Sequence, residues 1–318
     1  MYELLIKNGK TIYQPAVEEG ITWTTDLKGT PSDLKFKYIG DGKASIEEGN
    51  AVTFKVDKKE VFFGFLFTRK HQKDMLWDAT CYDQLRYFKN KDTYVYKNKR
   101  ADQVIRMLAT DFGMKVGTLD NTKFVLPSRV EENSTLFDMA QNALDLTMQH
   151  TKKMYVLYDK YGKLTLKNIG NNKVNILIDP QTGENYSYEV SIDQNTYNKV
   201  KLTYDNKDTG KREVYIAKST ASINKWGVLQ YFEKVQNKEN VKSKVNSLLN
   251  LYNQKTRTLT VKNAFGDIRV RAGVLIPVKL NLGDINIINY MLVTKAKHTF
   301  KNGEHFMDLT LRGGKINA

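Results

Sequence analysis

Short runs of alternating or continuous apolar residues constrain the fold of this chain more than any other feature. LKFKYIG, AVTFKV and VFFGFLFTRK show the pattern in the first third, with glycine or charged turns between them. Successive side chains of a strand point to opposite faces, so such runs predict half-buried β-strands. We therefore expect residues 1–98 to form a compact antiparallel β-barrel or sandwich.

Two helical patterns follow this β-body. In RADQVIRMLATDFG the apolar residues recur at three- and four-residue spacing, and Gly113 stands where a helix stop is expected. STLFDMAQNALDLTMQH places Thr135 and Asp138 at capping-box spacing. The expected buried stripes are Ala101, Val104, Ile105, Leu108, Ala109 and Phe112 in the first helix and Phe137, Ala140, Leu144 and Met148 in the second.

The partner layer for these helices is predicted directly after them. KMYVLYDKYGKLTLKNI has the pattern of two strands joined by the turn DKYGK. Helices that pack on a small sheet define an α+β unit. We therefore expect residues 99–178 to form an α+β insert domain.

Strand patterning resumes after residue 179. NKVKLTYDNKDTGKREVYIAK predicts a long hairpin with its loop at residues 205–211, and the last two strands meet at a KNGE turn whose Asn302 and Gly303 tolerate positive φ. A helix over about residues 237–254 interrupts the strands and presents one apolar face, made of Val241, Val245, Leu248, Leu249 and Tyr252. Residues 179–318 are thus expected to form a second β-barrel region with an inserted helix. The predicted fold class is mainly β, with two β-barrel domains and an α+β insert.

The charge balance favours acidic partners. The chain has 50 Lys and Arg against 35 Asp and Glu, a net charge of +15, which also raises the question of nucleic acid. The basic residues are interleaved with acids, as in KVDKKE and NKDTGKRE, rather than collected in one arm or helix. This distribution favours a basic surface over a dedicated nucleic-acid site.

The densest basic and aromatic strip covers residues 82–100. Tyr94 and Tyr96 share one face of a strand there, which suits either bases stacking on exposed rings or tyrosines buried behind solvated lysines. The helical period begins near Asp102, so the strip does not form one flat surface. The second interpretation, a structural strip, is favoured.

Catalytic and metal-binding signatures are not found. The sequence has no G-x-S-x-G elbow, Walker loop or dinucleotide-binding glycine pattern, and its four histidines form no closely spaced pair on one helix. His298 and His305 flank a hairpin turn, where they could face each other across it. We expect surface or half-buried strand residues there rather than zinc ligands. No catalytic, cofactor-binding or metal-ligating residue is predicted.

The acid pairs and the single cysteine have ordinary structural explanations. Glu18–Glu19, Glu47–Glu48 and Glu131–Glu132 lie where turn or helix-dipole acids are expected. Cys81 lies in an apolar run predicted to be core and cannot form an internal disulfide. The apolar patch near residue 4 is too short for a signal peptide or a membrane span. Synthesis in a reducing cytoplasm fits these features.

The strip also carries a family resemblance. ATCYDQLRYFKNKDTYVYKNK resembles the signature of baseplate hub proteins encoded by PBSX-type prophages and related contractile tail-like particles of Gram-positive bacteria. The family is distantly similar to the central hub of T-even phage baseplates and to the late control protein D group. Further matching segments run in order along the chain: GITWTTDLKGTPSDLKF, EEGNAVTFKVDKKEVFFGFLF, ENSTLFDMAQNALDLT, YVLYDKYGKLTLKNI, DQNTYNKVKLTYDNKDTGKREVY, KWGVLQYFEKV, RVRAGVLIPVKLNLGDI and HTFKNGEHFMDLTL.

The resemblance implies a structural protein without enzymatic activity. Three copies would form a ring, with two β-barrels per copy in a pseudo-sixfold arrangement, which joins the sixfold tail tube to the threefold central spike. The implied partners are the chain itself, the tail tube protein, the spike protein and other baseplate components, with no dedicated nucleic-acid site, no cofactor and no membrane anchor. The protein would be made in the bacterial host cytoplasm and assembled into the baseplate of a phage tail or a tail-like bacteriocin.

Three aromatics are candidate interface anchors: Trp23, Trp226 and Tyr231. Large aromatics are enriched at interface centres, but a place in the core explains each of the three equally well, and Trp23 above all because it lies in an alternating strand. Two other functions stay open, a tail protein associated with peptidoglycan hydrolysis and a basic nucleic-acid-binding protein.

Overall fold

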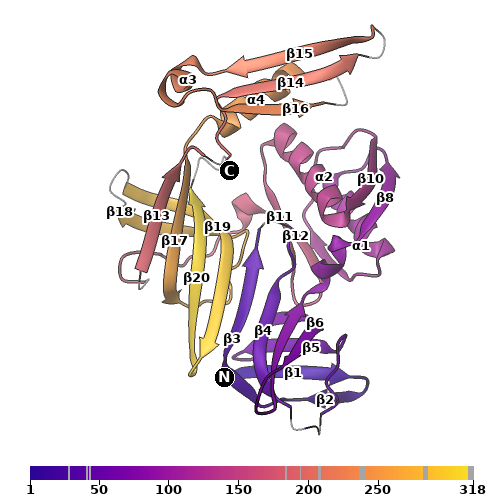
Figure 1. The fold of residues 1–318 in the computed structure, drawn as a ribbon, viewed down its shortest axis with the longest axis vertical. Helices are drawn as coiled ribbons and strands as arrows, with labels where there is room; N and C mark the ends of the chain where they lie inside the picture. Colours follow the sequence, from indigo (N-terminus) through magenta and orange to yellow (C-terminus); the bar gives the residue numbers. More distant parts are fainter. Residues whose placement is uncertain are drawn as a thin grey trace. The chain divides into compact units, whose positions relative to one another are not determined.

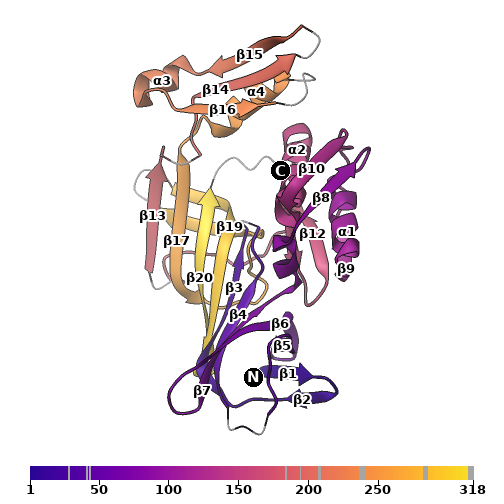
Figure 2. The ribbon, with the colours of Figure 1, turned by 45° about the vertical axis from the view of Figure 1, so that its right-hand side comes forward.

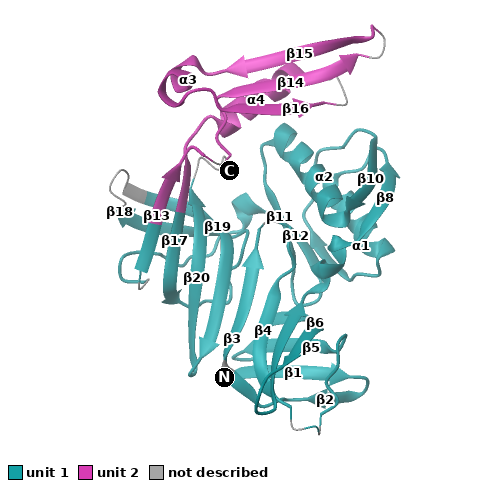
Figure 3. Ribbon diagram, viewed as in Figure 1, with its two compact units in different colours: residues 1–187, 259–318 teal, residues 188–258 magenta. Residues whose placement is uncertain are grey.

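The computed structural model describes residues 1–27, 29–40, 42, 44–182, 185–193, 195–206, 209–235, 241–281 and 286–313. The chain is mainly β with small helical parts, which confirms the expected class (Figure 1). It divides into two compact units, residues 1–187 with 259–318 (unit 1) and residues 188–258 (unit 2) (Figure 3). This division differs from the expected boundaries at residues 98 and 178.

A 12-stranded sheet organises the described part of unit 1, although residues 188–191 of β13 and 256–258 of β17 are assigned to unit 2. Its hydrogen-bonded path is β2-β1-β5-β6-β7-β4-β3-β19-β20-β17-β13, with β18 paired to β19. The first seven strands are β1 (Tyr2–Asn8), β2 (Thr11–Tyr13), β3 (Val17–Asp26), β4 (Asp33–Ile39), β5 (Ala51–Val56), β6 (Lys59–His71) and β7 (Leu76–Tyr82). The others are β13 (Asn185–Ser191), β17 (Thr256–Phe265), β18 (Leu275–Asn281), β19 (Asn286–Lys301) and β20 (Glu304–Gly313).

Strands β3 and β19 join the two ends of the chain. They are antiparallel, with Trp23 opposite His298, and both ribbon views show them side by side (Figures 1 and 2). Phe300 of β19 packs in the same core as Phe54 of β5, with ring centroids 5.0 Å apart. The two β-bodies expected from the sequence therefore share one continuous sheet. The alternating patterns are confirmed, since buried side chains alternate along β4 and β5.

The α+β insert lies between β7 and β13 in the chain. It comprises the 3-10 helix η1 (Gln84–Lys89), β8 (Lys91–Tyr96), α1 (Ala101–Asp111), β9 (Val116–Leu119), β10 (Arg129–Thr135), α2 (Leu136–Thr151), β11 (Tyr155–Asp159), β12 (Leu164–Asn168) and the 3-10 turn η2 (Ile169–Asn171). Strands β11, β12 and β9 form one small sheet, and β8 pairs with β10. The two helices and this sheet bury a common apolar core.

The helix predictions for the insert are largely correct. The predicted face of α1 is buried, and Thr135 and Asp138 form the predicted capping box of α2. The buried face of α2 is rotated from the predicted stripe and consists of Leu136, Met139, Ala140, Ala143, Leu144 and Thr147. Phe137 and Met148 are only partly buried. The small residues Ala143 and Thr147 face the core because the helix packs closely on its neighbours there.

Unit 2 has its own sheet and its own helical cover. The elements are β14 (Lys199–Asn206), β15 (Lys211–Lys218), α3 (Thr220–Trp226), β16 (Gln230–Lys234) and α4 (Val241–Tyr252). Central β14 pairs antiparallel with β15 and parallel with β16, and α4 buries Val241, Val245 and Leu248. Unit 2 therefore has a hydrophobic core of its own. The predicted hairpin and helix are confirmed, although residues 207–208 and 236–240 lie outside the described part.

Candidate interaction surfaces

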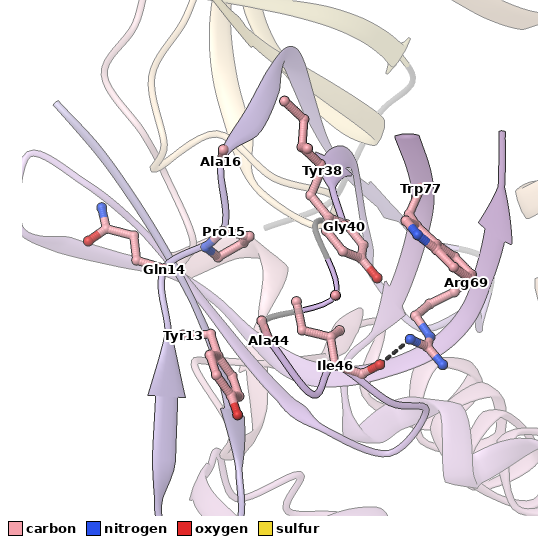
Figure 4. A pocket seen from close by; sticks show the side chains of 12 residues that line it. Tyr13, Gln14, Pro15, Ala16, Tyr38, Gly40, Ala44, Ile46, Arg69 and Trp77 are labelled. Carbon is pink, nitrogen blue, oxygen red and sulfur yellow. Dashed lines mark hydrogen bonds between the residues drawn. The ribbon is translucent and has the colours of Figure 1, made fainter. Parts of the chain in front are cut away.

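A hollow of about 410 Å³ opens on the surface of unit 1. The end of β2 and the segment after it form one side, and β6 and β7 form the other (Figure 4). Its lining residues are Tyr13, Gln14, Pro15, Ala16, Tyr38, Ile39, Gly40, Gly42, Ala44, Ile46, Arg69 and Trp77. Gly40 is required at the end of β4, because a Cβ there would lie 2.6 Å from the Trp77 ring.

Arg69 is the only charged side chain among the described lining residues, and it is held from within the chain. Its Nε and Nη2 donate to the two carboxylate oxygens of Glu48 at 3.0 and 3.1 Å, and its Nη1 donates to the carbonyl of Ile46 (Figure 4). These bonds raise the pKa of Arg69 and lower that of Glu48. The guanidinium also lies 5.1 Å from the centroid of Trp77.

The rim of the hollow is apolar. Ile39 lines it and is exposed, and exposed Met75 accepts a hydrogen bond at its carbonyl from the backbone N–H of Gly40. Exposed apolar groups around a depression are typical of protein–protein contact sites. The hollow therefore suits an apolar side chain of another protein better than a charged small molecule.

Asp83 is a buried carboxylate that connects β4 to the insert. One oxygen accepts hydrogen bonds from the backbone N–H of Ser32, at 3.0 Å, and from its hydroxyl, while the other accepts the N–H of Leu85 at 2.9 Å. Burial, with the nearby carboxylate of Asp159, raises the pKa of Asp83 to about 7. Both oxygens are already bound, so the side chain acts as a structural clamp.

Asp159 and Arg271 extend this clamp to the loop before β18. Asp159 accepts hydrogen bonds from Gln84 Nε2 at 2.7 Å and from the N–H of Gly162 at 2.6 Å. Arg271 donates to the backbone carbonyl of Asp159 at 3.0 Å, and its guanidinium lies 3.8 Å from the Tyr158 ring centroid. Burial raises the pKa of Asp159 and lowers that of Arg271. The insert is thereby fastened to the main sheet.

The histidine pair has a structural role. His298 Nε2 donates to the carbonyl of Val270 at 2.8 Å, which leaves Nδ1 to accept the Nε2–H of His305 at 2.9 Å. The prediction that the two face each other is confirmed, whereas a surface or half-buried position is wrong for His298. It is fully buried, because its side of β19 faces the core beside Trp23. Over the described ranges, no group of three or more His, Cys, Asp or Glu residues could hold a metal ion.

The three proposed anchors lie in different environments. Trp23 is 3% exposed, a core position that leaves almost none of its surface for a partner. Tyr231 is partly buried against Tyr252, 5.6 Å between ring centroids, and its hydroxyl donates to Glu233 at 3.0 Å. Burial raises the pKa of Tyr231. Trp226, at the end of α3, is partly exposed.

The basic strip at residues 82–100 is mostly framework. It runs from the end of β7 through η1 into β8, with Leu85, Phe88 and Tyr96 buried. The hydroxyl of Tyr94 donates to Asp111 at 2.9 Å. The buried rings and the hydrogen bond of Tyr94 support the structural interpretation of the strip.

The three acid pairs have local partners where they are described. Glu48 binds Arg69, and Glu18 lies 3.4 Å from Lys37. Glu131 is not a helix-dipole acid: it is buried in β10, where it accepts hydrogen bonds from Arg129 and Asn142. The side chain of Glu19 lies outside the described residues.

Sequence reasoning missed the hollow, because residues distant in the sequence, such as Tyr13, Tyr38 and Trp77, form it. It also missed an apolar surface on the sheet of unit 2, where Val214, Ile216 and Phe232 are exposed. REVYIAK did contain a signal for this surface: apolar residues fall on both faces of that strand, and α4 covers only one. No helix in the described part of the chain is long and apolar enough to cross a membrane.

Solved structures with a similar fold include phage tail proteins. The 43 kDa tail protein of prophage MuSo2 from Shewanella oneidensis matches with a TM-score of 0.71 at 14% identity, over 97% of this chain and 98% of that one. A tail protein from Neisseria meningitidis MC58 matches with a TM-score of 0.71 at 12% identity, over 99% and 97%. An Escherichia coli type VI secretion component, described as structurally similar to the T4 tail proteins gp27 and gp5, matches with a TM-score of 0.58 at 9% identity, over 99% and 78%.

The fold is thus one found in phage tail proteins, and a sequence relative belongs to a phage-like element. The chain belongs to the YqbQ-like family, whose model matches residues 21–312. The phage-like element PBSX protein XkdQ of Bacillus subtilis is 34% identical over 274 residues, 83% of this chain and 82% of the relative. The uncharacterized protein YqbQ of the same organism is 33% identical over 274 residues, 83% and 81%. The resemblance to a PBSX-type tail family is confirmed.

Proposed function

We propose that this chain is the structural hub of a contractile tail baseplate. Three copies form a ring that joins the sixfold tail tube to the threefold central spike. The observation that carries the proposal is the agreement between 34% identity to a PBSX element protein and fold matches to tail proteins that cover 97% and 99% of the chain. The threefold order comes from the family resemblance described above.

The internal use of polar side chains supports a role without catalysis. The carboxylates of Asp83 and Asp159, and both ring nitrogens of His298, are hydrogen-bonded inside unit 1. A general acid or nucleophile must instead present a free atom to substrate. The buried groups with shifted pKa values in this chain therefore fit a framework that holds its shape during tail contraction.

The surfaces of the chain supply contacts for such a ring. The hollow of unit 1 and its apolar rim suit a side chain from a neighbouring subunit or component, and Trp226 stays a proposed anchor in unit 2. The basic surface meets acidic faces of the tube, the spike or other baseplate components. The chain is made in the bacterial host cytoplasm and then incorporated into the particle.

A cryo-electron microscopy map of the assembled particle tests the proposal. We expect density for the chain as a threefold ring between the end of the tube and the spike. A particle without this chain, or a chain placed elsewhere in the particle, would refute it. Purified chain that binds DNA, with affinity collapsing between 50 and about 200 mM salt, would then favour the nucleic-acid alternative.

A further inference from the structure

The sheet of unit 2 has one covered face and one open face. The covered face contains Val200, Leu202 and Ala217, which pack with α4 in a common core. Side chains of a strand alternate between faces. Exposed Val214 and Ile216 of β15 and Phe232 of β16 therefore point away from α4, because they alternate with Tyr215, Ala217 and Tyr231.

The pairing register of β14, β15 and β16 determines which exposed side chains are neighbours on the open face. Lys201 of central β14 is opposite Ile216 on one side and opposite Phe232 on the other. Thr203 is likewise opposite Val214 and Lys234. The exposed fractions are 49% for Val214, 52% for Ile216 and 58% for Phe232. Exposed apolar side chains of the two outer strands therefore flank Lys201 and Thr203 of the central strand.

The charge of this face is strongly positive. The carboxylate of Asp205 on this face is bound by Arg212 at 2.6 Å and by Lys234 at 2.7 Å, which holds the pKa of Asp205 well below its usual range. Lys199, Lys201 and Lys218 have no ion-pair partner among the described residues. Lys199 and Lys218 are directly opposite each other in the pairing of β14 with β15.

A like-charge pair opposite each other in a sheet destabilises the fold. The arrangement is therefore not explained by the stability of unit 2 itself. An acidic surface laid on the open face would neutralise the repulsion, and aliphatic groups of the same surface would cover Ile216 and Phe232. This charge complementarity defines the kind of partner.

We propose that the open face, defined as Val214, Ile216, Phe232, Lys199, Lys201 and Lys218, is a docking surface for a protein with aliphatic side chains flanked by carboxylates. A second copy in twofold contact does not fit, since lysines would meet lysines. Nucleic acid fits less well, because phosphates gain nothing from Val214 and Ile216. The partner is another component of the particle, so the inference rests on the proposed hub function.

The amount of the chain incorporated into each particle measures this docking. Particles are produced from a prophage that lacks the gene and is complemented with wild-type chain or with Phe232→Asp. Because Phe232 is exposed, the variant is expected to fold, which circular dichroism of the purified chain verifies. We expect at least a tenfold loss of chain per particle, typical for an aromatic anchor at the centre of an interface. Lys201→Glu should give a loss as well.

Leu251→Asp is the matched control, since Leu251 is an exposed apolar residue, 41% exposed, on α4. It should be incorporated like the wild type. Normal incorporation of Phe232→Asp, or a map in which the open face is bare, would overturn the inference while leaving the hub function intact. A particle that lacks even the wild-type chain would overturn both. Self-association or DNA binding of the purified chain that Phe232→Asp or Lys201→Glu abolishes would also overturn it.

Discussion

At the scale of single residues, the buried histidine pair makes the stability of unit 1 depend on pH. Burial lowers the pKa of His298 to about 3 and that of His305 to about 4, so both rings are neutral in the folded chain at pH 5. Unfolded histidines have a pKa near 6.5. Below pH 6.5 the unfolded chain therefore binds protons that the folded chain does not, and the free energy of unfolding falls as pH falls.

We expect His305→Gln to lose less stability than wild type between pH 7 and 4.5, because glutamine donates to His298 without titrating. Each additional proton changes the slope by up to about 1.4 kcal/mol per pH unit. Urea unfolding at several pH values measures the slope. The raised pKa of Asp83 acts with opposite sign, since its stabilisation is lost as pH rises from about 4 to about 7. That effect is common to both chains and cancels.

His71→Gln is the control for this comparison. His71 is exposed on β6 and lies against Trp77, so its replacement measures the effect of a histidine-to-glutamine change outside the buried pair. Parallel stability curves for His305→Gln and wild type would show that the pair does not couple folding to protons.

At the scale of elements, Gly273 determines how closely β11 approaches the loop before β18. Its φ is +88°, and a Cβ would lie 2.5 Å from Val156 of β11. Gly49 has the same φ of +88°, but a Cβ there would meet nothing within 4 Å. We expect Gly273→Ala to destabilise the chain by about 1–3 kcal/mol more than Gly49→Ala, because overpacking adds to the backbone strain that both share. Thermal or urea unfolding of the two variants measures this difference, and equal losses would refute the close contact.

Sequence periodicity predicted local elements well and their mutual contacts poorly. The face of α1, the capping box at Thr135 and the β19–β20 turn at Asn302 each depend on residues a few positions apart. The pairing of β3 with β19 and the contact between Gly273 and Val156 depend on residues distant in the chain. No periodicity within a strand determines which distant strand will be its neighbour.

At the scale of the whole molecule, the elements of unit 2 are inserted in the chain between β13 and β17 of the main sheet. The chain leaves along β13 and returns along β17, which are hydrogen-bonded neighbours, and the hydroxyl of Thr256 donates to the carbonyl of Ser191 at 3.1 Å. Insertions with closely spaced ends are tolerated by their hosts. We expect that replacing residues 192–255 with a short Asn-Gly turn leaves unit 1 folded, with cooperative thermal unfolding by circular dichroism.

Deletion of the α+β insert provides the contrast. Val156 and Ile169 of the insert share a core with Leu275 and Leu292 of the main sheet, so removal of residues 99–171 should abolish cooperative unfolding. If instead the chain without residues 192–255 is the one that fails to fold, unit 2 is part of the framework of unit 1.

The candidate surfaces show the same limit of prediction at this scale. The family was accessible from the sequence segments that carry the resemblance, because they run in order along nearly the whole chain. The hollow and the open face of unit 2 were not, since each depends on which of two strand faces meets another layer. The burial of Trp23 was the favoured interpretation of its alternating strand, and the structure confirms it.

The antiparallel pairing of β3 with β19 can form only late in synthesis, because the two strands are far apart in the chain. β3 ends at residue 26 and β19 begins at residue 286. At about 5–20 residues per second, a ribosome needs roughly 13–50 s to translate the intervening segment. Throughout that interval the nascent chain carries β3 with one unpaired edge, a template for pairing with other chains. Polysomes translating this message therefore hold many such edges close together, and chaperone binding near the N-terminus would protect them until β19 emerges.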